Sequence, residues 1–183
     1  MLAVARAISI PVQVGGGIRS LDTIREYFSQ GVSKVVLGTA VLENPSLLEE
    51  ASQEFPDRIL IGIDVIQGKV AVNGWTDVSK VTPEEVFESL KSHPLAEVIF
   101  TEISRDGMLN GPNLIALEQA VCTSPFPVIA SGGITRVEDI YAIKQLGPKV
   151  TGVIVGKALY EGTLDLSSAL KAARVDLPIR GTC

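Results

Sequence analysis

Two stretches of the sequence combine an apolar run with adjacent glycines, and this combination is chemically suited to holding an anion. They lie at residues 12–19 (VQVGGGIR) and 128–135 (VIASGGIT). Glycine can adopt positive φ and so expose backbone N–H groups, and a helix pattern opens shortly after each turn. Amides and a helix N-terminus both favour negative charge. The pair therefore predicts two phosphate sites; for one turn alone, glycines that only permit a tight turn explain the pattern equally well.

The similarity between the two stretches extends past the glycines and indicates an internal repeat. A second apolar run follows in each copy, at residues 34–40 (KVVLGTA) and 152–158 (GVIVGKA), and each ends in a glycine and a polar residue. The matching positions in between are Ile18, Leu21, Ile24 and Gly31 with Ile134, Val137, Ile140 and Gly147. Each copy thus predicts two neighbouring strands whose glycine turns share one rim and form one phosphate pocket.

The composition is that of an ordinary soluble chain and excludes several function classes. The 183 residues, 46% hydrophobic and 20% charged, suffice for a single domain with one substantial core. The net charge of −5 and the lack of a basic run argue against nucleic-acid binding. Two cysteines and one histidine make neither a disulfide framework nor a metal site. No apolar run approaches the ~20 residues of a membrane span, so we expect a cytoplasmic protein.

Six apolar runs alternate with helix patterns along the chain. They are centred near Val12, Val35, Leu60, Val98, Val128 and Val153. Runs of this kind, without polar alternation, predict a buried parallel sheet. Residues 69–73 are expected to belong to the loop after the third run. Helix starts are predicted at Ser20, at Pro45, at a capping box formed by Thr82 and Glu85, and at Asn113.

Glycine and polar residues follow every predicted strand, which favours a (βα)8 barrel over an open doubly wound sheet with one switch point. A barrel of eight βα units has ~250 residues, so this chain would account for six. A helix pattern at residues 1–8 places the two absent units before the first predicted strand. We expect one incomplete TIM-barrel domain over residues 1–183, containing strands 3 to 8. Its unpaired sheet edges predict self-association, whereas a chain with all eight units would be a monomer.

The sequence resembles the phosphoribosylformimino-aminoimidazole carboxamide ribotide isomerases of histidine biosynthesis, a family of (βα)8 barrels with repeated halves. The resemblance covers about residues 3–173. It rests on residues 14–20 (VGGGIRS), 35–40 (VVLGTA), 62–64 (GID), 73–75 (NGW), 101–107 (TEISRDG), 111–113 (GPN) and 130–134 (ASGGI). It implies an Amadori rearrangement that turns an aminoaldose with a phosphate at each end into an aminoketose, without metal or cofactor.

The resemblance also assigns the groups that would hold this bis-phosphorylated ribotide by both ends. One phosphate would bind Gly17, Arg19, Gly38 and Thr39. The other would bind Gly107, Ser131, Gly133, Gly156 and Lys157. The charge at the two sites would come from Arg19 and Lys157, and the glycines would supply amides.

Asp64 matches the family's aspartate at the end of its fifth strand, so the resemblance implies that it is the general acid that opens the ribose ring. The alternative is a strand-end aspartate that caps a turn. The family's other aspartate, at the end of its first strand, has no counterpart here. Thr101 would orient the sugar, and Asp106 would either lie near the reacting sugar or order its loop. Trp75 would either stack on the imidazole carboxamide or only pack.

Three other functions stay open. The cyclase of the next pathway step has the same repeated barrel, although residues 73–75 and the pair Gly38 and Thr39 favour the isomerase. A bifunctional isomerase would also accept the tryptophan-pathway analogue. A non-catalytic phosphate-binding fragment would follow from an incomplete barrel.

Overall fold

The computed structural model describes residues 2–38, 44–72 and 74–179. Its parallel strands are β1 (Gln13–Gly15), β2 (Lys34–Leu37), β3 (Ile59–Ile66), β6 (Glu97–Glu102), β7 (Val128–Ser131) and β8 (Val150–Ile154). Its helices are α1 (Leu2–Ala7), α2 (Leu21–Ser29), α3 (Pro45–Glu54), α4 (Pro83–Leu90), α5 (Leu114–Thr123), α6 (Val137–Lys144), α7 (Lys157–Tyr160) and α8 (Leu166–Arg174). The predicted α/β class and the six predicted strands are confirmed.

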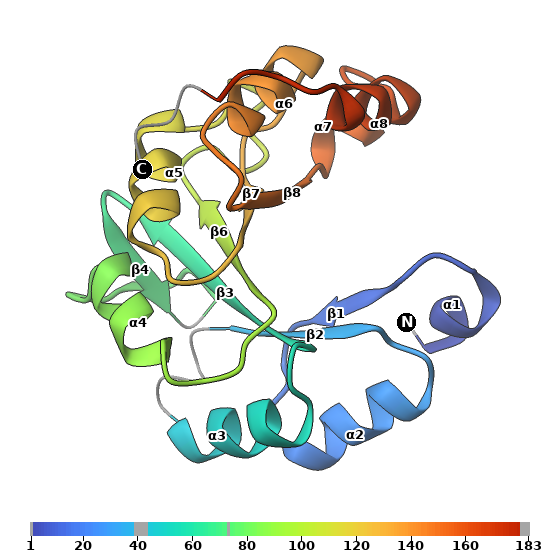
Figure 1. Ribbon diagram of the computed structural model, residues 1–183, viewed down its shortest axis with the longest axis vertical. Helices are drawn as coiled ribbons and strands as arrows, with labels where there is room; N and C mark the ends of the chain where they lie inside the picture. The colour runs from blue at the N-terminus through green and yellow to red at the C-terminus, as the bar shows by residue number, and fades with distance from the viewer. Residues whose placement is uncertain (1, 39–43, 73, 180–183) are drawn as a thin grey trace.

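Each parallel strand pairs with its neighbours in the chain, so the spatial order is β1-β2-β3-β6-β7-β8. This order never reverses, and the described residues therefore contain no switch point of a doubly wound sheet. Figure 1 shows the strands curving in an open arc with α2, α3, α4, α5 and α6 on its outer side. The winding is that of a barrel-type α/β fold. Within the described ranges, β1 and β8 stand at the two ends of the strand order.

The side chains of the central parallel strands alternate between two separate cores. On β3, Ile59, Ile61 and Ile63 are fully buried against the helices and belong to the main core. The intervening Leu60 belongs instead to a small cluster on the inner side of the sheet, together with Ile99 and Ile129. Burying one large aliphatic side chain contributes about 1.5–3 kcal/mol, so the larger outer core dominates the stability of the fold.

The chain leaves β3 through a hairpin that the sequence did not predict. Gln67 and Gly68 have φ values of 51° and 75°, the left-handed conformations that a two-residue hairpin turn requires. β4 (Lys69–Val72) then returns antiparallel along β3 and pairs with β5 (Asp77–Val78). The expectation of a loop was therefore wrong for residues 69–72, because Val70 and Ala71 are buried and pair in the sheet. Residue 73 lies outside the described residues.

The predicted helix starts are confirmed. Ser20 accepts a hydrogen bond from the backbone N–H of Thr23, and Asn113 does the same for Ala116. Thr82 and Glu85 form the capping box of α4. The start of α6 has a different cap, because the Asp139 carboxylate accepts the backbone N–H groups of Thr135 and Arg136. These caps fix where the turns after β1 and β7 end.

A polar cluster closes the amino-terminal end of the sheet. Glu97 of β6 accepts hydrogen bonds from Lys34 of β2 at 2.5 Å and from Thr151 of β8 at 2.6 Å. The three side chains come from alternate strands, which is how layers form inside barrels. Burial raises the pKa of the Glu97 carboxyl, but the hydrogen bonds from Lys34 and Thr151 and the charge of Lys34 outweigh burial and hold the pKa below its usual value.

Glu97→Gln is expected to lower the free energy of unfolding at pH 7 by about 1–3 kcal/mol, because it leaves the Lys34 ammonium without its charged partner. Since the pKa of Glu97 is lower in the folded state, its stabilisation is present above the unfolded pKa and is lost as the pH falls through the folded pKa. Urea unfolding at pH 7 and near pH 3.5 measures the effect, which should shrink in acid. Glu26→Gln, at an exposed position of α2, is the control. An equal loss at both pH values would contradict this role of Glu97.

Candidate functional site

The carboxyl ends of the parallel strands surround a cavity of about 700 Å³. Its walls come from all six parallel strands or the turns that follow them, and its polar side chains are Arg19, Asp64, Thr101 and Ser131. In barrel-type α/β proteins this end of the strands carries the ligand site. The cavity is therefore the candidate functional site.

The strand register brings three of the predicted site residues to one level of the rim. Asp64 of β3 is in register with Thr101 of β6, and Thr101 is in register with Ser131 of β7. Thr101 is buried, whereas Asp64 and Ser131 are partly exposed to the cavity. A carboxylate and two hydroxyls thus stand side by side on adjacent strands, a set of groups that can exchange protons with a bound sugar.

Trp75 contacts this row of polar groups directly. Its indole Nε1 donates a hydrogen bond to Oδ2 of Asp64 at 2.8 Å. The side chain is 46% exposed, and the backbone of Trp75 has φ of 75°, an uncommon conformation for an aromatic residue. Neither of the two alternatives for Trp75, stacking or packing, included this hydrogen bond. No sequence pattern predicted the hydrogen bond to Asp64, because the two residues meet only through the β3–β4 hairpin.

The first glycine turn opens onto the large cavity. Gly16 and Gly17 have φ of 103° and 67°, and the space where a Cβ would stand is free of other atoms within 4 Å. Gly17, Arg19 and Gly38 all line the cavity, so the structure brings these three predicted phosphate ligands together. Thr39, the fourth, lies outside the described residues.

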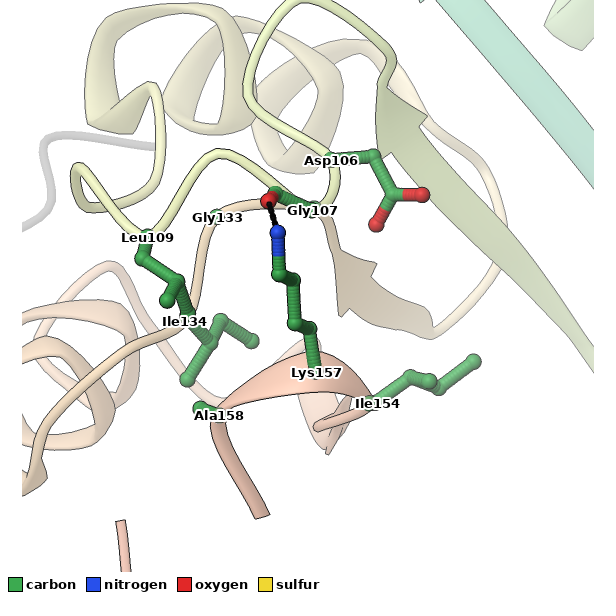
Figure 2. A pocket seen from close by; sticks show the side chains of 10 residues that line it. Asp106, Gly107, Leu109, Gly133, Ile134, Ile154, Lys157 and Ala158 are labelled. Carbon is green, nitrogen blue, oxygen red and sulfur yellow. Dashed lines mark hydrogen bonds between the residues drawn. The ribbon is translucent and has the colours of Figure 1, made fainter. Parts of the chain in front are cut away.

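The second set of predicted phosphate ligands lies around a neighbouring cavity of only about 20 Å³, lined by Gly107, Gly133, Gly156 and Lys157. Figure 2 shows Lys157 extending across it, with its Nζ donating to the backbone carbonyl of Gly107 at 3.0 Å. A space of this size holds about one water molecule. Ser131 lines the larger cavity instead, and Ile154 lines both, so the two cavities adjoin.

Asp106 lines the small cavity, whereas Asp64 lines the large one. The loop of Asp106 is held by Glu102, a buried carboxylate at the end of β6. Glu102 accepts hydrogen bonds from Ser104 and from Asn113 Nδ2. Sequence reasoning missed this role of Glu102. The available signal was a glutamate at the end of an otherwise apolar strand, since a buried carboxylate must find several donors.

The glycines of the second turn are required by packing as well as by conformation. A Cβ on Gly132 would stand 2.7 Å from the carbonyl oxygen of Glu102, and one on Gly133 would stand 2.5 Å from that of Gly111. The turn after β7 therefore packs directly on the loop that follows β6. The two turns look alike in the sequence, but only the first leaves free space around its glycines.

No group of three or more potential metal-ligating side chains occurs in residues 2–38, 44–72 and 74–179. None of the helices in those ranges combines the length and apolar character needed to cross a bilayer.

The model of the histidine biosynthesis protein family matches residues 1–165 of the chain. The chain belongs to this family. The resemblance found in the sequence is thereby confirmed, and the matched range includes both glycine turns that line the two cavities.

Several relatives in this family are closely similar. The chain is 47% identical over 171 residues to a protein of Gloeothece citriformis and 48% identical over 171 residues to one of Rippkaea orientalis. Each match covers 93% of this chain and 66% of the relative, so the chain spans slightly less than two thirds of their length. A protein of Desulfosudis oleivorans is 44% identical over 174 residues, covering 93% of this chain and 68% of the relative. All three are named 1-(5-phosphoribosyl)-5-((5-phosphoribosylamino)methylideneamino) imidazole-4-carboxamide isomerase.

Alanine substitutions in the two glycine turns should separate the requirement for close packing from the requirement for positive φ. Gly133→Ala is expected to destabilise the fold by more than about 3 kcal/mol, because its Cβ would collide with the backbone at Gly111. Gly17→Ala should cost only about 1–2 kcal/mol, the cost of positive φ, because its surroundings are open. Urea unfolding of both variants measures this, each serving as the other's control. Equal destabilisation would contradict the difference in packing.

Proposed function

We propose that this chain forms the substrate site of an aldose–ketose isomerase that converts the bis-phosphorylated aminoaldose ribotide of histidine biosynthesis to its aminoketose. The observation that carries the proposal is the row formed by Asp64 and Thr101 in the large glycine-lined cavity, which adjoins a second glycine-lined cavity. The names of the relatives support it. Such a substrate is long and anionic at both ends, and two separate phosphate sites suit its shape.

The two phosphates would bind at different kinds of site. At the first, the open amides of the turn at Gly17 and the guanidinium of Arg19 face the large cavity, with Gly38 on the next strand. At the second, Gly107, Gly133, Gly156 and Ser131 supply backbone and hydroxyl donors. Here the ammonium of Lys157 would exchange the carbonyl of Gly107 for a phosphate oxygen. A charged acceptor forms the stronger hydrogen bond, which favours that exchange.

The chemistry requires an acid and a base. Asp64, protonated, would give its proton to the ribose ring oxygen, so that the C1–O bond breaks and the amine nitrogen forms a Schiff base. A base then removes the C2 proton, and the electron pair moves into the C2–C1 bond to give the enamine, which tautomerises to the aminoketose. Proton transfer by one positioned group contributes about 10²–10⁴-fold. Thr101, in register with Asp64, would orient the sugar, and the ring of Trp75 would stack on the imidazole carboxamide.

Asp64 is the one carboxylate among the described residues that line the large cavity. Asp106 is a further candidate, because it lines the cavity that adjoins the first at Ile154. A lining with one carboxylate among its described residues favours a second function, in which the chain binds the ribotide without turning it over. Binding measured separately from turnover distinguishes the two.

For the architecture, we propose a (βα)8 barrel of which this chain forms six units. Two features support it: the unbroken strand order from β1 to β8, and exposed apolar side chains near both ends of that order. Near β1 these are Val4, Ile8 and Ile10, and near β8 they are Ile154, Tyr160, Leu166 and Leu170. Apolar surface at strand edges favours association with another polypeptide.

Replacement of Asp64 by asparagine is expected to lower kcat for the aminoaldose ribotide by at least about 10²-fold, because the amide cannot donate and regain the proton. Absorbance of the ribotide follows turnover, and calorimetry follows binding. Arg19→Met is the matched control, since loss of a phosphate contact should weaken binding more than it slows chemistry. Equal turnover by parent and D64N would refute the role of Asp64, whereas binding without turnover in the parent would select the second function.

Sedimentation velocity at micromolar concentration should show species larger than a monomer, because apolar side chains near β1 and β8 are exposed. The double variant Leu166→Glu and Leu170→Glu, which charges the exposed face of α8, should shift the distribution toward monomer. Met108→Glu is the control, because Met108 is exposed in a loop, whereas the neighbouring Leu109 packs against the core. A monodisperse monomeric parent would contradict the proposal for the strand edges.

A further inference from the structure

A buried carboxylate joins the two ends of the loop that lines the small cavity. Glu102 is the last residue of β6, one position after Thr101, and it is not among the described residues that line either cavity. It is 8% exposed. Its Oε1 accepts hydrogen bonds from the backbone N–H of Ser104 at 3.2 Å and from the Ser104 hydroxyl at 2.9 Å, and its Oε2 accepts one from Asn113 Nδ2 at 2.8 Å. One side chain thus holds both ends of residues 104–113.

Only a carboxylate satisfies all of these donors. A backbone N–H cannot accept a hydrogen bond, so the atom that faces Ser104 must be an acceptor. The amide of Asn113 cannot turn over to offer its oxygen instead, because Oδ1 of Asn113 already accepts the N–H of Ala116 as the cap of α5. A glutamine at position 102 would therefore point its NH2 group at a donor on one side or the other. A buried donor without an acceptor favours opening of the loop.

The loop between these two anchors forms part of the wall of the small cavity. Gly107 and Leu109 line the cavity, and the carbonyl of Gly107 accepts the hydrogen bond from Lys157 Nζ. Leu109 has φ of 53°, a conformation that a bulky residue keeps only where neighbouring contacts impose it. The loop also touches the second glycine turn, since a Cβ on Gly133 would stand 2.5 Å from the carbonyl oxygen of Gly111. The position of the loop therefore decides the shape of the cavity.

We propose that Glu102 is a positioning residue for the second phosphate site. It touches no ligand itself, and it holds residues 104–113 so that the backbone at Gly107 and the ammonium of Lys157 face one phosphate of the ribotide. This inference rests on the proposed function, but the ordering of the loop by Glu102 is testable without any ligand. Because the pairing of β3 with β6 fixes Asp64 independently of the loop, loss of the Glu102 carboxylate should weaken binding more than it slows the chemistry.

The first experiment measures amide hydrogen exchange of residues 103–113 in the unliganded parent and in Glu102→Gln. The N–H groups of Arg105 and Asp106 donate to the carbonyls three residues before them, so their exchange reports on opening of the loop. Exchange should be at least about tenfold faster in Glu102→Gln. Glu97→Gln is the matched control, because Glu97 is the carboxylate at the other end of β6 and its loss should leave exchange of the loop unchanged. Equal exchange in the parent and Glu102→Gln would overturn the proposal.

The second experiment measures binding of the aminoketose ribotide by calorimetry. Glu102→Gln should raise Kd by about tenfold, and in turnover of the aminoaldose ribotide KM should rise while kcat changes by less than about threefold. A double-mutant cycle locates the effect. Glu102→Gln should add little in Lys157→Met, whose second phosphate site is already impaired, but should have its full effect in Arg19→Met. A full effect in both backgrounds, or a fall in kcat larger than the rise in KM, would overturn the positioning role.

Absence of ribotide binding by the parent would overturn the proposed function and, with it, a role of the loop in holding phosphate. The exchange experiment would still decide whether Glu102 orders residues 104–113, because it uses no ligand. The two failures are therefore distinguishable.

Discussion

The backbone register between β3 and β6 is the constraint on which the site depends. Six residue pairs, from Leu60 with Glu97 to Val65 with Glu102, fix the level of each side chain on the central strands. A slip by one residue would turn Asp64 toward the helices and bring Ile63 or Val65 to the cavity. Such a slip would expose the residues of the outer core, so the hydrophobic energy that stabilises the fold also holds Asp64 beside Thr101.

Much of this arrangement could be predicted because it is encoded locally. Apolar runs that end in glycine or a polar residue predicted the six parallel strands, and capping residues such as Ser20 and Asn113 predicted where helices begin. The strand ends also grouped Gly17, Arg19 and Asp64 on one rim. The features that could not be predicted depend on contacts between residues distant in the sequence. Residues 69–72 form a strand because they pair with β3 and β5, and the contact of Trp75 with Asp64 depends on that pairing.

The two glycine turns show how one sequence pattern can serve different physical needs. Around Gly17 there is open space, and the glycine is needed only for its backbone conformation. Around Gly133 the carbonyl of Gly111 leaves no room for a Cβ, so the same residue type is also required for close packing. Sequence alone could not separate these cases, because both turns follow an apolar run and precede a helix. The difference arises from the loop after β6, which Glu102 holds in place.

The inner side of the sheet has an apolar layer in its middle, with one polar group of residues at each end of the strands. Leu60, Ile99 and Ile129 form a thin apolar layer across its middle. Below that layer, Glu97 is satisfied by two neighbours on the strands and is largely withdrawn from solvent. Above it, Asp64 accepts a hydrogen bond from the indole of Trp75, a residue that follows the β3–β4 hairpin, and lines the large cavity. Two carboxylates on the inner side of one sheet therefore differ in their surroundings: Glu97 is satisfied by neighbouring strands, whereas Asp64 is partly exposed to the candidate site.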